Sequence, residues 1–369
     1  MFSSKKGQLC VCLIIISVFL LLDACLIFVY FKYFVPLNGK GPVVPIVVTT
    51  WNYSTANDRA WDVIARNGTA LHSVEMGIAQ CEIEQCRHTV GYGGSPDEHG
   101  ETTLDALLMD GSSMNVGAVG ALRQVKSAVS VARFVLNYTS HSMLVGSQAT
   151  DFALAMGFRA ENLSTDYSLE IHRRWKENKC QPNYWQNVSP DPKNNCGPYH
   201  SIRYSLPRVK GSAASVNEIE MIDDENHDTI GMISVDHKGN VAAGTSTNGL
   251  TNKIPGRVGD SPIPGAGAFA ESGIGAAVAT GNGDIMMRFA PTAIAVELLR
   301  MGYSAQIAAQ TVISRISKYY PEFQGAVVVA TPYGDVAAAC SGWNTFPYSV
   351  HARGSNMTIK TIRCSQYLH

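Results

Sequence analysis

The segment His227-Asp228-Thr229 combines residue types that could cleave an amide bond without a cofactor. A threonine hydroxyl is a weak nucleophile, but the α-amine of the same residue can serve as its base once the preceding peptide bond is cut. Asp228 places a carboxylate beside that bond, and the Thr229 hydroxyl could attack it in an N-to-O acyl shift. Taken alone, a threonine that begins a strand after an acidic linker is an ordinary structural residue. The segment therefore gives a hypothesis that its surroundings have to support.

Two residues further along the chain would suit the charged ends of an amino acid. The run Gly256-Arg-Val-Gly-Asp260 places a guanidinium and a carboxylate three residues apart. Arg257 has a planar fork that can hold a carboxylate through two hydrogen bonds, and Asp260 could accept an ammonium group. The alternative for this pair is an ordinary surface turn. Glycine-rich runs at residues 244–249, 265–269 and 279–284 would let the backbone approach a ligand closely.

Composition and missing motifs narrow the function classes. The 29 basic and 30 acidic residues give a formal net charge of −1, so the basic face that nucleic-acid binding requires is not expected. The sequence has no Gly-x-Ser-x-Gly elbow, no zinc-hydrolase motif and no phosphate-binding GK[ST] pattern. Neither a metal nor another cofactor is therefore expected.

Residues 1–40 form a segment of their own. Lys5 and Lys6 precede an apolar run over residues 9–31 that only Ser17 and Asp23 interrupt. The run suits either a cleaved signal peptide or an uncleaved membrane anchor, and a buried core helix is a third interpretation. In both of the first two cases the rest of the chain enters the secretory lumen.

Sequons and cysteines also favour the lumen. The six N-x-S/T sequons begin at Asn52, Asn67, Asn137, Asn162, Asn187 and Asn356. Six cysteines lie beyond the apolar run, an even number that is typical of disulfides in an oxidising compartment. Pairing of neighbours would join Cys81–Cys86, Cys180–Cys196 and Cys340–Cys364, although connectivity does not follow from the sequence alone. A zinc site is the competing interpretation, but no CxxC or HxxxH spacing accompanies these cysteines.

The elements that must position the reactive residues follow from the hydrophobic pattern. Strands are expected at residues 43–50, 104–109, 229–235 and 241–247, with a hairpin over 325–331 and 335–339. Helices are expected at residues 58–65, 69–84, 165–177, 289–301 and 305–319, and residues 116–136 are predicted as a helix pair or one long helix. Six of the twelve residues 217–228 are acidic, which predicts a solvated, mobile linker. The order of elements favours helical layers that flank a central pair of sheets.

Read together, seven motifs resemble the glycosylasparaginase family of N-terminal-nucleophile hydrolases. The resemblance extends from about Val47 to Cys364. The matching stretches are Cys81-Glu-Ile-Glu-Gln-Cys86, Gly93-Gly-Ser-Pro-Asp-Glu98, Cys180-Gln-Pro-Asn-Tyr-Trp185, His227-Asp-Thr-Ile-Gly231, Thr245-Ser-Thr-Asn-Gly249, Gly256-Arg-Val-Gly-Asp-Ser-Pro-Ile-Pro-Gly265 and Ala279-Thr-Gly-Asn-Gly-Asp284.

The resemblance implies an α+β fold, a four-layer αββα sandwich, and autoproteolysis between Asp228 and Thr229. Residues 41–228 would form an α subunit and residues 229–369 a β subunit, which stay associated and form a dimer of αβ pairs. The implied reaction is hydrolysis of the amide that joins N-acetylglucosamine to the asparagine side chain of a small glycoasparagine, in the lysosome. The length of the apolar run 9–31 leaves two possibilities for the enzyme in that compartment: a soluble protein, or one tethered to the membrane.

The resemblance also assigns roles to single residues. Thr229 would be nucleophile and base, and Thr247 would lie beside it and tune its hydroxyl. Thr280 and the Gly281 amide would form the oxyanion hole. Arg257 would hold the α-carboxylate of the substrate, and Asp260 would hold its α-ammonium. Trp51 would line the pocket and press on the strained peptide bond of the precursor.

This chain departs from the family at Ala309 and Val329, where some relatives have one further disulfide. Two other functions are alternatives to glycoasparagine hydrolysis. One is an isoaspartyl peptidase or L-asparaginase of the same superfamily, and the other is an uncleaved, membrane-tethered glycoprotein that binds ligands without catalysis.

Overall fold

The computed structural model describes residues 41–202 and 229–365. The apolar run 9–31, the acidic linker 217–228 and both His227 and Asp228 lie outside the described residues, so the predictions for them stay predictions. Within the described ranges no helix has the length and apolar character needed to cross a membrane.

The strand that follows Thr229, β7, belongs to an eight-stranded sheet. Its strand order is β14-β13-β1-β7-β8-β2-β3-β4, and its neighbours are antiparallel except for the parallel β3–β4 pair. In sequence order the strands are β1 Ile46–Thr50, β2 Leu104–Asp110, β3 Val116–Leu122, β4 Met143–Val145, β7 Ile230–Val235, β8 Val241–Thr247, β13 Thr345–Ala352 and β14 Thr358–Arg363.

A four-stranded antiparallel sheet faces the larger one. Its order is β12-β11-β10-β9, from the strands β9 Ala268–Glu271, β10 Gly275–Gly281, β11 Gly325–Ala330 and β12 Val336–Ser341. Strand β10 contacts β7 and β8, and β9 contacts β2 and β8, so the two sheets pack against each other. Strands β7, β8, β10 and β11 are buried along their whole length, as their nearly continuous apolar or small residues require.

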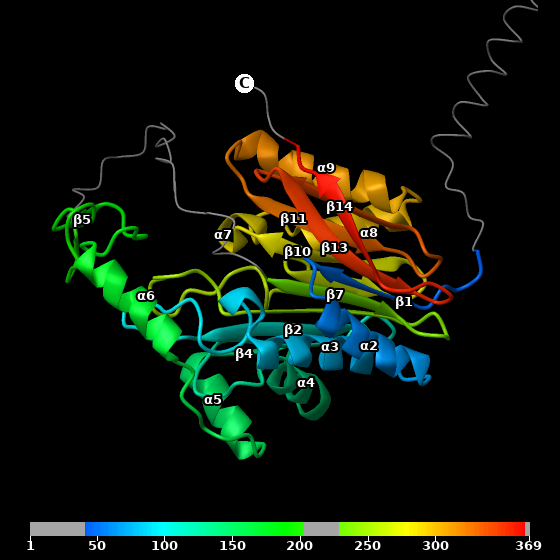
Figure 1. Ribbon diagram of the computed structural model, residues 1–369, viewed down its shortest axis with the longest axis horizontal. Helices are drawn as coiled ribbons and strands as arrows, with labels where there is room; N and C mark the ends of the chain where they lie inside the picture. The colour runs from blue at the N-terminus through cyan, green and yellow to red at the C-terminus, as the bar shows by residue number, and fades with distance from the viewer. Residues whose placement is uncertain (1–40, 203–228, 366–369) are drawn as a thin grey trace, which may run out of the picture.

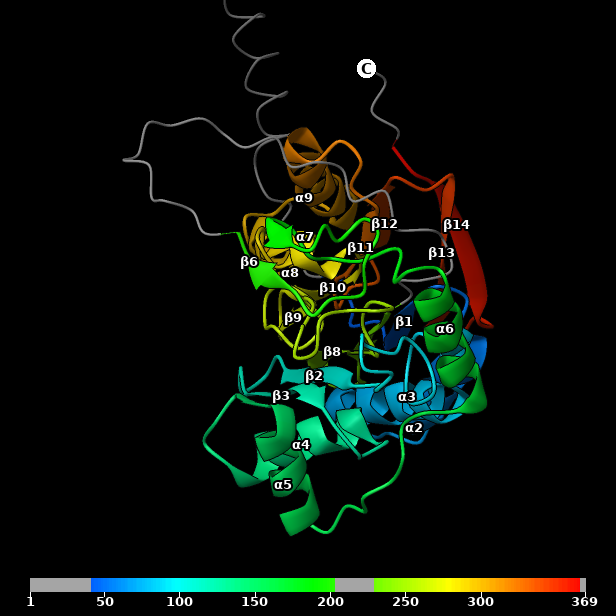
Figure 2. The same ribbon diagram turned by 90° about the vertical axis from the view of Figure 1, so that its left-hand side faces the viewer.

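Helices cover the outer side of each sheet. The larger sheet contacts α2 Ser54–Ala65, α3 Ala70–Glu84, α4 Ala128–Tyr138 and α5 Gly146–Ala155, and the smaller contacts α8 Pro291–Arg300 and α9 Ala305–Tyr319. Figure 1 shows α8 and α9 above the sheets and α2 and α3 below them, and Figure 2 shows α4 and α5 below β3. The arrangement is α+β, as predicted.

A separate arm contains α6 Asp166–Glu177 and the short strands β5 Val188–Ser189 and β6 His200–Ser201. Thr165 caps α6 by accepting a hydrogen bond from the Ser168 backbone N–H. The disulfide Cys180–Cys196 closes the loop that follows α6. Disulfides also join Cys81 to Cys86 and Cys340 to Cys364, so all three bonds link neighbouring cysteines.

The prediction of helix over residues 116–136 is wrong in its first half. Residues Val116–Leu122 form β3, and the helix α4 begins only at Ala128. The run VGAVGAL has no polar face because it lies between β2 and β4 with helices against it, and a strand covered in this way loses the alternation that would identify it. Strands β13 and β14 and helix α5 were not predicted at all.

Two hydrophobic clusters hold the layers together. The larger joins α2, α3 and α4 to both sheets, and the smaller lies between α8, α9 and the outer side of the four-stranded sheet. Ala309 and Val329, where the resemblance predicts the absence of one disulfide, are both fully buried in the smaller cluster. Their apolar side chains contribute to the packing of α9 against β11.

Candidate active site

A small pocket at the ends of β7, β8 and β10 brings five of the predicted site residues together. Its volume is about 10 Å³, which is room for about one water molecule. Its lining consists of Thr229, Thr247, Gly249, Arg257, Gly259, Asp260, Ser261, Gly281 and Gly283. Two more predicted residues, Trp51 and Thr280, are connected to Thr229 through hydrogen bonds.

The sheet register sets the position of Thr229. Strand β7 begins at Ile230, which pairs with Ser246 of β8, so Thr229 lies one step further along, beside Thr247. The hydroxyl of Thr50, at the end of β1, donates to the Thr229 carbonyl (2.9 Å) and accepts from the Gly231 N–H (2.8 Å). Through these two hydrogen bonds, the Thr50 hydroxyl of the neighbouring strand β1 holds the backbone at the start of β7 in place. Thr229 itself is 4% exposed.

Thr280 contributes a hydroxyl whose two acceptor positions are both used. Its Oγ1 accepts a hydrogen bond from the Trp51 indole Nε1 (3.1 Å) and one from the Thr229 backbone nitrogen (3.2 Å). A hydroxyl has one donor hydrogen and two lone pairs. Neither of these two bonds uses the hydrogen of the Thr280 hydroxyl, and Thr280 lies fully buried next to Gly281 of the pocket lining.

Trp51 is held in an unusual backbone conformation. Its φ angle is +61°, in the left-handed region, where a bulky aromatic residue is strained. Its ring packs against Trp343 and Phe346, with centroid distances of 5.0 Å to each. Ser349 donates to its carbonyl oxygen at 3.0 Å. These contacts direct the indole N–H at Thr280.

Gly281 ends β10 with a φ of +127°, also in the left-handed region. A Cβ at this position would lie 2.4 Å from the Cα of Gly325 in the adjacent strand. The residue therefore has to be glycine, both for its conformation and for the close approach of β11.

Asp284 is a third residue beside the predicted amino-acid subsite of Arg257 and Asp260. Arg257 donates from Nε (3.1 Å) and Nη2 (2.7 Å) to Oδ2 of Asp284, and its Nη1 faces Gly249 in the pocket lining. Arg257 therefore presents only part of its guanidinium to the pocket while Asp284 holds the rest.

Asp260 is a buried carboxyl with unused hydrogen-bonding capacity. It is 3% exposed, and among the residues that the structure describes none donates to its Oδ2. Burial raises the pKa of Asp260 to about 7, against the opposing effect of Arg257 and with further increases from Asp284 and Asp105. A cation brought into the pocket would favour its ionised form.

Thr247 uses its hydroxyl within the protein. Its Oγ1 accepts from the Gly249 N–H (3.0 Å) and donates to the Thr89 carbonyl (3.3 Å). The side chain therefore stabilises the turn after β8. The register of β7 and β8 places Thr247 beside Thr229.

Three residues near the pocket were not predicted. Thr50 gave no signal beyond its place at a strand end, and Asp284 was noted only as part of a glycine-rich run. Asp105 is a charged residue near the start of a mostly apolar strand, which is a usable signal for a buried functional carboxylate. It accepts from the Ala121 N–H at 2.7 Å, and burial raises its pKa.

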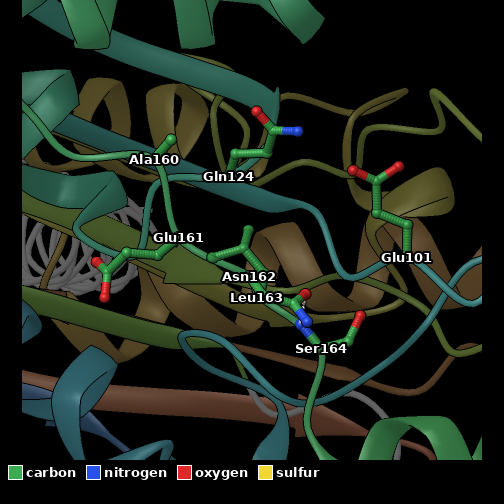
Figure 3. Close-up of a pocket in the computed structure, with 7 residues that line it drawn as sticks. All are labelled: Glu101, Gln124, Ala160, Glu161, Asn162, Leu163 and Ser164. Atoms are coloured by element: carbon green, nitrogen blue, oxygen red, sulfur yellow. Dashed lines mark hydrogen bonds between the residues drawn. The ribbon is translucent and has the colours of Figure 1, made fainter.

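A larger groove of about 480 Å³ lies elsewhere and is shown in Figure 3. It is lined by Glu101, Gln124, Ala160, Glu161, Asn162, Leu163 and Ser164. Asn162, the sequon residue, accepts from the Ser164 N–H at 2.9 Å, and Glu101 pairs with Arg123. This lining contains no nucleophile with an adjacent base, so the smaller pocket is the better catalytic candidate despite its size. In the described ranges no three His, Cys, Asp or Glu side chains cluster as a metal site would require.

Comparison with known proteins places this arrangement in a family. Residues 42–359 match the family model described as asparaginase. A rat protein named N(4)-(beta-N-acetylglucosaminyl)-L-asparaginase is 52% identical over 313 residues, which cover 85% of this chain and 88% of the rat protein. The mouse protein of the same name is 53% identical over 310 residues, covering 84% and 88%. A relative from Drosophila grimshawi is 52% identical over 331 residues, covering 89% and 84%. The resemblance predicted from the motifs is confirmed, and the chain belongs to the asparaginase family.

Proposed function

We propose that this chain is an autoprocessed amide hydrolase that cleaves the bond between N-acetylglucosamine and the asparagine side chain of small glycoasparagines, during glycoprotein degradation. One observation carries the proposal: Thr229, Arg257, Asp260 and Gly281 line one pocket. The names of the rat and mouse relatives, each about half identical to this chain, support the substrate class. Nothing in the pocket favours the alternative isoaspartyl peptidase or L-asparaginase.

The reaction begins at Thr229. Cleavage after Asp228 turns the Thr229 backbone nitrogen into an α-amine, which takes the proton of the Thr229 hydroxyl as Oγ1 attacks the substrate amide carbon. The amide C–N bond then breaks, the α-amine returns the proton to the departing nitrogen, the sugar leaves as a glycosylamine, and an aspartyl ester on Thr229 remains. Water hydrolyses this ester and releases aspartate.

The tetrahedral intermediate needs donors for its oxyanion. The Thr280 hydroxyl supplies one, because its acceptor positions are occupied by Trp51 and Thr229 and its hydrogen is left to donate. The N–H of Gly281 supplies the second. A donor of this kind contributes roughly 2.7–4 kcal/mol to transition-state stabilisation.

The charged end of the substrate is held by Arg257 and Asp260. The α-carboxylate lies against the guanidinium beside Gly249, and the α-ammonium pairs with the unpartnered Oδ2 of Asp260. Gly283 leaves room for that carboxyl, since a Cβ there would lie 2.8 Å from Asp260 Oδ1. Because the pocket has little free volume, substrate entry requires side chains around it to move.

We also propose the subunit organisation and the fold in detail. Residues 41–228 and 229–369 are the two chains. In the first chain, β1 pairs with β7 and β13 of the second, and β2 pairs with β8 of the second, which supports their lasting association. The two packed sheets with helices outside them support the four-layer αββα sandwich. A dimer of αβ pairs, delivery to the lysosome, and removal or retention of residues 9–31 as an anchor remain parts of the proposal.

A denaturing gel with N-terminal sequencing tests the cleavage, and substrate assays test the activity. The chain expressed in a secretory system gives two fragments, the smaller one beginning at Thr229, and Thr229→Ala leaves the chain whole. The wild type hydrolyses a glycoasparagine faster than a β-aspartyl peptide or free asparagine. A full-length chain with no fragments contradicts the processing, and a preference for the β-aspartyl peptide contradicts the substrate.

A further inference from the structure

A lysine behind the pocket has surroundings that the mechanism does not yet explain. Lys253 is 2% exposed, which is rare for a lysine because removal of its charge from water is unfavourable unless partners compensate. Its Nζ donates to the carbonyl oxygens of Ser95 (3.0 Å) and Asn248 (2.9 Å), which are neutral partners. Burial lowers the pKa of Lys253 to about 8, against the opposing effect of Asp105. At neutral and acidic pH this buried side chain is therefore still a cation.

Lys253 and Arg257 border the same point of the pocket lining. A Cβ built on Gly249 would lie 3.1 Å from Nη1 of Arg257 and 3.7 Å from Nζ of Lys253. Gly249 itself lines the pocket, and its φ of +73° together with these two neighbours explains why no side chain is present there. Two cations therefore lie behind one glycine, at the place where the proposed function puts the substrate α-carboxylate.

Two like charges in a buried region repel each other, and an anion placed between them relieves that repulsion. Asp284 neutralises Arg257 from one side by accepting from Nε and Nη2. On the other side, Nζ of Lys253 lies toward Gly249, and the buried carboxyl of Asp105 interacts with both cations. Its bond to the Asn248 carbonyl also fixes the turn whose Gly249 N–H donates to Thr247.

We propose that Lys253 is a positioning residue for the α-carboxylate subsite: its charge and its hold on the Asn248–Gly249 turn direct the free side of Arg257 toward the substrate carboxylate. This inference rests on the proposed function for the identity of the substrate. It predicts a contribution that depends on the α-carboxylate of the ligand and is absent when the ligand lacks that group.

The test compares three variants of the full chain after processing has been checked on a denaturing gel. Lys253→Met removes charge and donor, Lys253→Gln removes the charge and keeps a donor, and Lys253→Arg keeps the charge. Calorimetry measures the binding of L-homoserine and of 3-amino-1-propanol, which differ only in the α-carboxylate and are not substrates. KM and kcat for a glycoasparagine are measured in parallel.

Lys253→Gln and Lys253→Met weaken L-homoserine binding about tenfold, equivalent to about 1.4 kcal/mol, and change 3-amino-1-propanol binding less than twofold. KM for the glycoasparagine rises by a similar factor with kcat nearly unchanged, and Lys253→Arg restores both to within about threefold of wild type. Equal weakening of both ligands, or a fall in kcat alone, overturns the proposal, and so does failure of Lys253→Arg to restore binding.

The calorimetry separates this inference from the proposed function. A wild-type chain that binds L-homoserine in a Lys253-dependent manner but leaves glycoasparagines intact supports the subsite and refutes the substrate. A wild-type chain that binds neither ligand refutes the subsite. If Lys253→Met fails to fold, Lys253→Gln and Lys253→Arg still give the comparison between charge present and charge absent.

Discussion

Thr280→Val isolates the hydroxyl that we assign to the oxyanion hole. Valine keeps the branched shape of the side chain and removes the oxygen. That oxygen accepts from Trp51 Nε1 at 3.1 Å and from the Thr229 nitrogen at 3.2 Å, so in the proposed mechanism its one hydrogen is left for the oxyanion. The substitution therefore removes one donor to the oxyanion and one acceptor for two buried N–H groups.

The two losses affect different measurements. Loss of an oxyanion donor lowers kcat about 10²–10³-fold, equivalent to about 2.7–4 kcal/mol. Loss of the acceptor leaves the indole N–H of Trp51 unpaired in a site where that ring is 5% exposed, which lowers the free energy of unfolding by about 1–3 kcal/mol. KM is expected to change little, because the proposed function assigns the charged ends of the substrate to Arg257 and Asp260.

The assay measures kcat for a glycoasparagine per mole of processed enzyme, with the processed fraction quantified on a denaturing gel. Thr280→Ser is the matched control, since it keeps the hydroxyl and loses only a methyl group, and its kcat is expected to stay within about tenfold of wild type. Urea unfolding gives the stability change separately. The reasoning is refuted if processed Thr280→Val keeps more than a tenth of the wild-type kcat, or if the serine variant is as slow as the valine variant.

Three further predictions concern the rest of the pocket. Arg257→Lys raises KM about a hundredfold with a smaller change in kcat, because an ammonium cannot hold Asp284 and a substrate carboxylate together as the guanidinium fork does; steady-state kinetics check this, and an unchanged KM contradicts it. Burial raises the pKa of Asp260 to about 7, so the carboxyl is neutral below that pH and must lose its proton to pair with an ammonium. KM therefore rises as the pH falls below about 7, by up to tenfold per pH unit, and a KM profile that is flat from pH 8 to 5 would exclude this role; Asp260→Asn should give a high KM without that pH dependence. Gly281→Ala lowers the free energy of unfolding by more than about 2 kcal/mol, because its Cβ would lie 2.4 Å from the Gly325 Cα. Gly256→Ala, which has a φ of +89° but no atom within 4 Å of the new Cβ, provides the control with backbone strain alone and a loss of about 1 kcal/mol, and equal losses in the two variants would show that the close approach is unimportant.

The sequence indicates candidate site residues more readily than the hydrogen-bond partners that orient them. The roles of Arg257 and Asp260 can be inferred from their residue types, while those of Thr280 and Gly281 are implied by the family resemblance. Arg257, Asp260 and Gly281 line one pocket with Thr229, and Thr280 is hydrogen-bonded to Thr229 behind it. The partners that orient them come from distant segments with common residue types. Arg257 is tied to Asp284, 27 residues away, and nothing in the spacing of the Arg257–Asp260 pair indicates this.

Thr50 shows the same limit more sharply. It bridges the Thr229 carbonyl and the Gly231 N–H across about 180 residues of chain, and a threonine at the end of a β-rich run is otherwise expected to be a packing residue. The incorrect helix at residues 116–122 has a related cause. A strand of small apolar residues that is covered on its faces shows neither the alternation of polar and apolar residues nor the periodicity of an amphipathic helix.

The strand order explains how a cut between Asp228 and Thr229 could activate the site without displacing it. β7, which follows Thr229 directly, lies between β1 and β8, and β1 comes from before the cut while β8 comes from after it. Both neighbours remain hydrogen-bonded to β7 whether or not the preceding peptide bond exists. The carbonyl of Thr229 is held by Thr50 and its nitrogen by Thr280, so cleavage changes the chemistry of that nitrogen from amide to amine at a position already fixed. In the proposed mechanism, folding of the precursor therefore places the nitrogen that becomes the base, and cleavage supplies its lone pair.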